Sequence, residues 1–408
     1  MKNWGYLAMP NGLSVIQNKA IGLSRSMLGS KVFVALCCFP FFKSTFYDSL
    51  GSLGAVANAM LVVETCSFAF LFLLCGYRSK LTVAVLLYFA WSLVLAPSFS
   101  GFMPPSSYYF FSGFGFLLFV LLGFRSAGTK FINALSGVFC FAAMVNAALL
   151  LMFPDGVFQT AAGRVWLFGI RTGFPYVLIP ALCICLLHDV TMQRSTFSIR
   201  TILTCLVALY SIFNQWIATG LVELVLMFGL YIAVCNGFRF RYVLFTGISL
   251  VIAFLVLTSG PATIIGDLVN YLGKDVTFTG RTDIWARTIN DILAHPLFGC
   301  GGIEYVVVFG EVKAFHSLWL SVCHESGIIG LLLFLVVIYI AADNLRRANN
   351  SIALVAGCAF FPILLASIVE IQTYFPFIYG VLAISEYALS YSNFNRSDRK
   401  LPVLMRIR

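Results

Sequence analysis

The chain has 408 residues, of which 60% are hydrophobic and only 10% are charged. Soluble domains carry about 25% charged residues, so this deficit, with a mean hydropathy of +0.94, excludes an ordinary soluble domain and predicts a membrane protein. The net charge of +10 would suggest nucleic-acid binding in a soluble protein. Most basic residues stand in short links between apolar runs, and no basic stripe interleaved with aromatic residues occurs. We therefore expect contacts with anionic lipid headgroups and no nucleic acid.

The apolar runs predict an all-α fold, a polytopic transmembrane helical bundle of about 12 spans that forms a single integral membrane domain over residues 1–408. The first 29 residues are fairly polar and show no cleavable signal peptide. The division near 218–220 is the least distinct, because the chain there is apolar on both sides. The predicted spans are 30–47, 52–75, 81–98, 108–124, 131–153, 174–188, 201–218, 219–236, 243–259, 327–342, 351–370 and 376–391.

Lysine and arginine concentrate in alternate links, as they do in the cytoplasmic links of membrane proteins. With twelve spans, all these links fall on one side, which predicts a multi-pass protein with both termini in the cytoplasm. The basic residues are Arg78, Lys80, Arg125, Lys130, Arg194, Arg200, Arg239, Arg241, Arg346 and Arg347, with Arg396, Arg399, Lys400, Arg406 and Arg408 in the tail.

Two loops on the opposite side carry arginines against this trend. Residues 154–173 form a second basic extracytoplasmic loop with Arg164 and Arg171, and residues 260–326 form the longest polar stretch, a long extracytoplasmic loop in which we expect short helices. Arginine binds carboxylate and phosphate groups through a bidentate fork. We therefore expect these arginines to form an anion-binding site on this side.

The first half of the long loop predicts a helix that begins near Thr282. Arg281 then lies at its entrance, so its guanidinium and the helix N-terminus face the same place, which suits a phosphate group. Lys274 adds a point charge nearby. The alternative for Arg281 is a plain ion pair with Asp283. Arg287 lies six residues further on, so it does not share a helix face with Arg281.

Arg287 has two interpretations, a contribution to the anion site or a structural ion pair with Asp291, and the second is favoured. His316 is a candidate proton donor or acceptor near neutral pH, whereas the other two histidines of the long loop are expected to be structural. Cys300 and Cys323 share this loop and can form a disulfide, although nothing in their spacing requires one.

Polar residues inside or near predicted spans are costly and often functional. Glu223 lies near the outer end of its span, where it can face the loop arginines, and it is a possible intramembrane polar member of the site. The other polar residues are scattered over several spans and are Glu64, Asn146, Asn214, Gln215 and Glu386.

Several motifs are absent from the sequence. No GxxxxGK[ST] loop indicates ATP chemistry, no Asp-x-Asp pair indicates a metal-bound nucleotide sugar, and no HExxH or CxxC pattern indicates zinc. No GxSxG elbow indicates a serine hydrolase. We therefore expect no metal and no cofactor.

Four segments together resemble the O-antigen polymerase/ligase family, the group of Wzy-type polysaccharide polymerases and the related O-antigen ligase. The twelve-span layout, with the largest outer loop before the tenth span, agrees with that family over the whole chain. The segments are Lys274-Asp275-x-Thr277-x-Thr279-Gly280-Arg281-Thr282-x-Ile284-Trp285, Pro296-Leu297-x-Gly299-x-Gly301, His316, and Gly327-Ile328-Ile329-Gly330.

The resemblance implies a glycosyltransferase of the plasma (inner) membrane that joins glycans carried on undecaprenyl pyrophosphate at the outer face. Polymerases transfer the growing glycan to a new repeat unit, and ligases transfer it to lipid A core. Ligases of the family carry a Ser-Arg pair near the outer end of the helix matching 201–225, where this chain reads Trp216-Ile217-Ala218-Thr219-Gly220. Gly169-Ile170-Arg171-Thr172-Gly173 resembles a basic motif of capsular and exopolysaccharide polymerases, so the resemblance favours a polymerase.

The same resemblance implies roles for individual residues. Arg281, Arg171 and Arg164 would hold the donor pyrophosphate, and His316 would position or deprotonate the attacking hydroxyl. A chain-length regulator is an implied partner. The alternatives are a ligase or, from other classes, a lipid-linked glycan flippase or transporter, or a structural scaffold.

Overall fold

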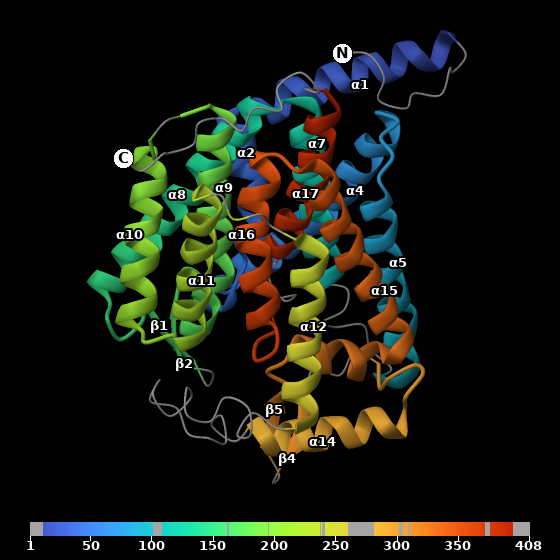
Figure 1. The fold of residues 1–408 in the computed structure, drawn as a ribbon, viewed down its shortest axis with the longest axis vertical. Helices are drawn as coiled ribbons and strands as arrows, with labels where there is room; N and C mark the ends of the chain where they lie inside the picture. The colour runs from blue at the N-terminus through green and yellow to red at the C-terminus, as the bar shows by residue number, and fades with distance from the viewer. Residues whose placement is uncertain are drawn as a thin grey trace.

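The apolar runs form helices that lie roughly along one axis of the molecule (Figure 1). This arrangement comes from a computed structural model that describes residues 11–100, 108–160, 163–194, 196–236, 238, 241–259, 281–301, 305–308, 311–371 and 376–394. The first predicted span, 30–47, is broken into α2 (Lys31–Cys38), the 3-10 turn η1 (Pro40–Phe42) and α3 (Thr45–Ser49).

The remaining runs each contain one main helix. Hydrogen bonds inside a helix satisfy every interior backbone group, which is why apolar spans take this form. The helices are α4 (Ser52–Leu74), α5 (Lys80–Ser100), α7 (Gly115–Ser126) with the π-helical turn η2 (Phe110–Phe114) before it, α8 (Thr129–Met152), α9 (Phe174–Thr191), α10 (Ile199–Asn214), α11 (Ala218–Cys235), α12 (Tyr242–Ser259), α15 (Leu318–Ala348), α16 (Ser351–Ala366) and α17 (Phe377–Phe394).

Within the described residues, five helices are long and apolar enough to cross a membrane, or six if a bent pair near the N-terminus counts as one span. They are 52–74, 129–152, 171–191, 218–235 and 318–348, and five further apolar helices are shorter. The chain is therefore an all-α membrane protein in its main body. The predicted number of twelve spans is not confirmed, because several of the described helices are shorter than the roughly 20 residues that a helix needs to cross a bilayer.

An unpredicted helix, α1 (Asn11–Leu28), precedes the bundle and lies across one end of it (Figure 1). The chain turns by 84° between this helix and the next one. Ser24 Oγ lies 2.9 Å from Ser126 Oγ, and Arg25 Nε donates to the Ser126 carbonyl at 3.1 Å. Val15, Ile16 and other apolar side chains remain exposed on α1. A helix of this kind suits the plane of a membrane interface.

Hydrogen bonds gather the basic links at the same end. Arg125 Nη2 donates to the Arg78 carbonyl at 3.1 Å, and Arg200 Nη1 donates to the Asn133 carbonyl at 2.8 Å. Arg125 also pairs with Glu386 of α17, and these two side chains are only 7% and 10% exposed. Glu386 thus has a structural partner, and the links that carry Arg78, Arg125 and Arg200 lie at the same end of the bundle.

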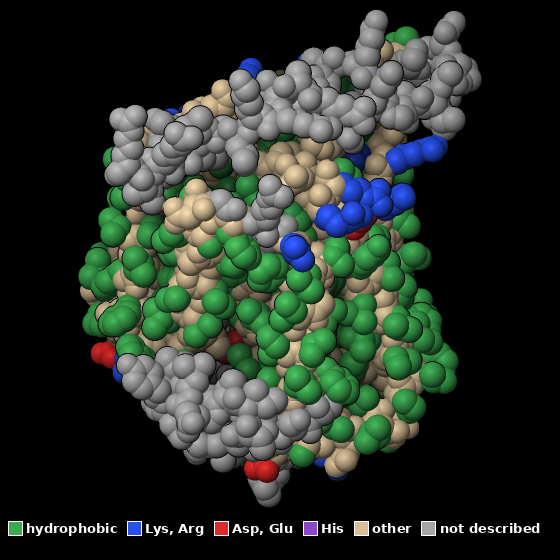
Figure 2. Space-filling model, in the orientation of Figure 1, with side chains coloured by type: hydrophobic (Ala, Val, Ile, Leu, Met, Phe, Trp, Pro, Cys, Tyr) green, Lys and Arg blue, Asp and Glu red, His purple; other side chains and the backbone are tan. Residues whose placement is uncertain are grey.

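Aromatic rings fill the core between the two ends. The Phe377 ring lies 5.0 Å from that of Phe42, 5.2 Å from that of Phe116 and 5.1 Å from that of Phe139, measured between centroids. The apolar stretch of α9 is fully buried, whereas that of α11 is only 22% buried. Helix α9 is therefore central and α11 peripheral. Hydrophobic side chains cover the sides of the bundle, as expected for a surface in contact with lipid (Figure 2).

The end opposite α1 carries two small antiparallel sheets and one helix (Figure 1). Strands β1 (Phe158–Thr160), β2 (Gly163–Trp166) and β3 (Gly169–Ile170) form one sheet, and β4 (Tyr305–Val308) and β5 (Glu311–Ala314) form a hairpin. Helix α14 (Arg281–Ala294) lies beside the hairpin. Short helices were expected in the long loop, and the strands are an addition to that prediction. The two basic loops therefore lie at the same end of the molecule.

Candidate functional site

The second basic loop is fixed rigidly to the bundle. Trp166 is fully buried and its Nε1 donates to the Phe153 carbonyl at 2.8 Å. Asn146, inside α8, accepts a hydrogen bond from the Phe168 amide at 3.1 Å. Asn146 thus supports this loop from within the membrane helix, which gives that buried polar residue a structural role.

The two arginines of this loop have different surroundings. Arg164 lies on β2 and forms an ion pair of 2.8 Å with Asp155, in which both side chains are more than half exposed. Arg171 begins the 3-10 turn η3 (Arg171–Gly173) that leads into α9. Its side chain is exposed and forms no ion pair with any residue that the structure describes. Arg171 is therefore the arginine of this loop that is free to bind an anion.

Glu370 contacts the start of α9 with its buried carboxylate and the start of α15 with its main chain. Tyr176 Oη donates to Glu370 Oε2 at 2.8 Å, although the two residues are 194 positions apart. The Leu318 amide donates to the Glu370 carbonyl at 3.2 Å and to the Ser367 carbonyl at 3.0 Å. The Arg171 turn, the end of α16 and the start of α15 therefore meet at one place.

His316 stands at this junction, directly before α15. Its φ is +51°, a left-handed conformation that few residues other than glycine adopt. Its neighbours Phe315 and Ser317 are fully buried, whereas His316 itself is half-buried. Ser317 Oγ has no hydrogen-bond partner among the described residues. Backbone strain of this kind occurs preferentially at functional sites, so His316 keeps its place as a candidate.

Helix α14 docks against the same junction. Trp285 is buried, and its Nε1 donates to the Phe315 carbonyl at 3.0 Å. Arg281 is the first described residue of α14, one turn before Trp285. The predicted position of Arg281 at the helix entrance stays a prediction, because the residues before it lie outside the described part of the chain. The Arg281 side chain and all of Lys274 lie outside the described residues.

Arg287 forms the ion pair that its structural interpretation predicted. Its Nε lies 3.4 Å from Asp291 Oδ1, and its side chain is 59% exposed. Asp291 Oδ2 lies 3.8 Å from His324 Nε2, and the His324 ring is 4.5 Å from that of Phe315. His324 is 3% exposed and belongs to this packing, which suits the structural role expected of it.

Two glycines, each in one of the segments that carry the family resemblance, contact each other. A Cβ on Gly299 would lie 2.5 Å from the His324 carbonyl oxygen, and a Cβ on Gly327 would lie 2.2 Å from the Leu297 carbonyl oxygen. The Ile328 amide donates to the Pro296 carbonyl at 2.9 Å. We call this contact of 296–299 with 324–328 the glycine clasp. It fixes the end of α14 to a kink in α15 and explains why both segments need glycine.

The cysteines near the clasp are free thiols. Cys300 and Cys323 are not bonded to each other. Burial, with the nearby Asp291 carboxylate, raises the pKa of the Cys300 thiol. A thiol with a raised pKa is a poor nucleophile at neutral pH. Neither a disulfide nor cysteine chemistry is part of this site.

Glu223 lies near the α9 entrance. A Cβ on Gly220, one turn earlier in α11, would lie 2.6 Å from Pro175 Cγ. Glu223 itself is 1% exposed. Glu223 therefore lies inside the packing and not on an open surface, and its place beside the loop arginines stays a prediction.

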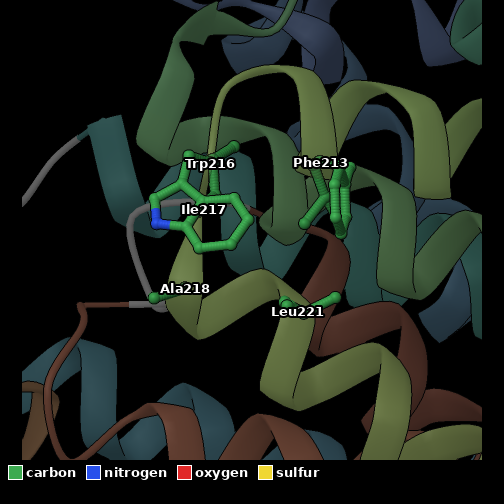
Figure 3. Close-up of a pocket in the computed structure, with 6 residues that line it drawn as sticks. Phe213, Trp216, Ile217, Ala218 and Leu221 are labelled. Atoms are coloured by element: carbon green, nitrogen blue, oxygen red, sulfur yellow. The ribbon is translucent and has the colours of Figure 1, made fainter. Parts of the chain in front are cut away.

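The turn between α10 and α11 encloses a small apolar cavity (Figure 3). Helix α10 ends at Asn214 and α11 begins at Ala218, so the least distinct predicted division does separate two helices. The cavity volume is about 10 Å³, which is room for one water molecule at most. It contains no charged residue and is not part of the candidate site. Its lining is Ile212, Phe213, Trp216, Ile217, Ala218 and Leu221.

Sequence reasoning did not select Glu370 or Tyr176. The same principle that selected Glu223 applies to Glu370, because a carboxylate at the end of an apolar run is costly to bury. What the sequence does not contain is the pairing of Tyr176 with Glu370, which depends on the packing of α9 against α16.

The bundle of apolar helices, with its polar end built from two basic loops, defines an integral membrane protein. Residues 201–335 match the family Wzy_C, described as O-antigen ligase. This match confirms, for that segment, the resemblance to the O-antigen polymerase/ligase family. It includes Glu223, Arg281, Arg287 and His316. No curated protein is detectably similar to the chain.

Proposed function

We propose that the chain is a membrane polysaccharide polymerase. It would join undecaprenyl-pyrophosphate-linked oligosaccharide repeat units into capsular, exopolysaccharide or O-antigen chains at the outer face of the plasma membrane. The observation that carries this proposal is the family match over 201–335. That segment contains His316, whose backbone is strained and which stands near Glu370 and the start of α9. A chain-length regulator would be a partner protein.

The proposed orientation has twelve spans, both termini in the cytoplasm and the two basic loops outside. The gathering of Arg78, Arg125 and Arg200 at one end supports it, because cytoplasmic links carry the excess of basic residues. The sheets and α14 lie at the other end (Figure 1).

In the proposed reaction, the bond between the anomeric carbon and the pyrophosphate oxygen of the donor breaks. A sugar hydroxyl of the acceptor attacks that carbon and forms the new glycosidic bond, while His316 accepts its proton. Arg281 and Arg171, assisted by Arg164 and Lys274, hold the departing pyrophosphate and stabilise its charge. The pyrophosphate is already a good leaving group, so orientation and charge stabilisation supply the rest.

Arg287 has a lesser role in this proposal, because its guanidinium already pairs with Asp291. Glu370 is a positioning residue. Its main-chain carbonyl accepts the Leu318 amide at the start of α15, and its carboxylate accepts the Tyr176 hydroxyl at the start of α9. Glu223, buried in α11, would support the same region.

The proposal is tested with the purified full-length chain in proteoliposomes that contain a lipid-linked repeat unit. We expect a ladder of polymer lengths and release of undecaprenyl pyrophosphate. Transfer to added lipid A core, with no ladder, would instead identify a ligase. Movement of the lipid-linked glycan across the bilayer without bond formation would identify a flippase. Either result would overturn the polymerase assignment.

His316→Gln should lower turnover by about 10²–10⁴-fold, because it removes a group that transfers a proton, and should leave the melting temperature unchanged. His324→Gln is the matched control. It removes a buried ring packed on Phe315, so it should lower the melting temperature and preserve turnover per folded molecule. The measurements are polymer formation and thermal unfolding in the same detergent. Wild-type turnover in the His316 variant would exclude a catalytic role for His316.

A further inference from the structure

A groove of about 540 Å³ runs along the side of the bundle between α2 and α8. Its walls are apolar over most of their length and basic at one end. The lining of the apolar part is Val32, Ala35, Phe39, Phe42, Tyr47, Ala134, Val138, Phe141, Ala142, Val145 and Leu167, and the basic end is formed by Lys31 and Arg200 with Asn133 and Gly137.

The groove exists because the first predicted span is broken. Helix α2 has 8 residues, which rise about 12 Å, less than half of the roughly 30 Å of a hydrocarbon core. It therefore leaves part of the α8 surface uncovered. Phe141 on α8 is 65% exposed, and Val32 on α2 is 71% exposed.

Two cations at the basic end lack anionic partners. Arg200 Nη1 donates to the Asn133 carbonyl at 2.8 Å, to Asn133 Oδ1 at 2.8 Å and to Ser136 Oγ at 3.0 Å, all of which are neutral groups. Lys31 is exposed at the first turn of α2. Neither side chain forms an ion pair with a carboxylate of the described chain. Positive charge and a helix N-terminus together favour a phosphate group at this position.

We propose that this groove binds an anionic phospholipid, with its headgroup at Lys31 and Arg200 and an acyl chain along the α2–α8 wall. From Asn133 to Val145 the α8 surface rises about 18 Å, close to one leaflet of a roughly 30 Å core. The basic part of the groove and Arg125 lie at the same end of the bundle, opposite the candidate site. A polyprenyl substrate would place its pyrophosphate near Arg171, at the other end, so the charge of the groove favours a phospholipid.

The test uses the full-length chain, stripped of lipid in detergent and then titrated with phosphatidylglycerol or phosphatidylcholine of identical acyl chains. Native mass spectrometry counts the retained lipids. We expect one phosphatidylglycerol to be retained in preference to phosphatidylcholine. Lys31→Glu should weaken phosphatidylglycerol retention about tenfold, and Ala142→Trp, which fills the apolar part, should abolish it. Arg200 is left intact because its hydrogen bonds hold α10 to α8.

Two matched controls separate the groove from general effects. Lys130→Glu makes the same charge change at an exposed residue outside the groove, and Leu36→Trp adds bulk at an α2 residue that is 60% exposed and does not line it. Both should retain phosphatidylglycerol as the wild type does. Three results would each overturn the proposal. The first is equal retention of the two lipids, and the second is a loss of phosphatidylglycerol in Lys130→Glu equal to that in Lys31→Glu. The third is that added undecaprenyl phosphate is retained in preference to phosphatidylglycerol and that Lys31→Glu does not change this.

Discussion

Arg281→Ala is expected to abolish long polymer and to leave single repeat units on the lipid carrier. Arg281 is the first described residue of α14, and if the helix starts there, as the sequence predicts, the helix dipole and the guanidinium both favour the pyrophosphate. Removing one donor that stabilises developing charge costs about 10²–10³ in turnover. Arg281→Lys should recover only part of this loss, since an ammonium group lacks the bidentate fork. Polymer length on gels and release of undecaprenyl pyrophosphate measure both effects.

Arg287→Ala is the control for this experiment, because it removes an identical charge from the same helix. The Arg287 side chain is 59% exposed and pairs with Asp291, and exposed pairs of this kind contribute about 0–1 kcal/mol to stability. We expect polymer lengths within a few-fold of the wild type. Normal polymer in the Arg281 variant, or an equal loss in both variants, would contradict the assignment of Arg281 to the pyrophosphate site.

Gly327→Ala is expected to release α14 from the bundle and to lower the melting temperature strongly. Gly327 has φ +63° and ψ −167°, a region that only glycine adopts readily, and forcing another residue into it costs about 1–3 kcal/mol. The added Cβ would also lie 2.2 Å from the Leu297 carbonyl oxygen, and overpacking adds about 1–3 kcal/mol. Gly299→Ala should act in the same direction, because its Cβ would contact His324 and Gly327.

Gly247→Ala is the matched control. Gly247 lies inside α12, and a Cβ there would meet nothing within 4 Å. Alanine in a helix interior is about 0.5–1 kcal/mol more favourable than glycine, so this variant should be as stable as the wild type or slightly more so. Thermal unfolding and limited proteolysis between α14 and α15 measure the difference. Equal stability of the Gly327 and Gly247 variants would show that the glycine clasp does not hold α14.

The sequence predicted the helices well and their lengths less well. Hydrophobic runs predict helices because membrane segments must satisfy their own backbone groups, and every predicted run contains a helix in the part that the structure describes. The break in 30–47 occurs at Pro40, which begins η1. Proline lacks the amide that a continuing helix needs. The β4–β5 hairpin was missed, although Val306, Val307 and Val308 are β-branched residues that favour strands.

By itself, the sequence determined the class of the protein and the positions of most of its helices. These properties depend on local composition and charge, which can be summed along the chain. Only the tertiary structure decided which polar residues meet. It paired Arg287 with Asp291, left Arg171 exposed at the start of the central helix, and joined Tyr176 to Glu370 beside His316. Those contacts depend on how distant helices pack, and that information is not contained in any single segment.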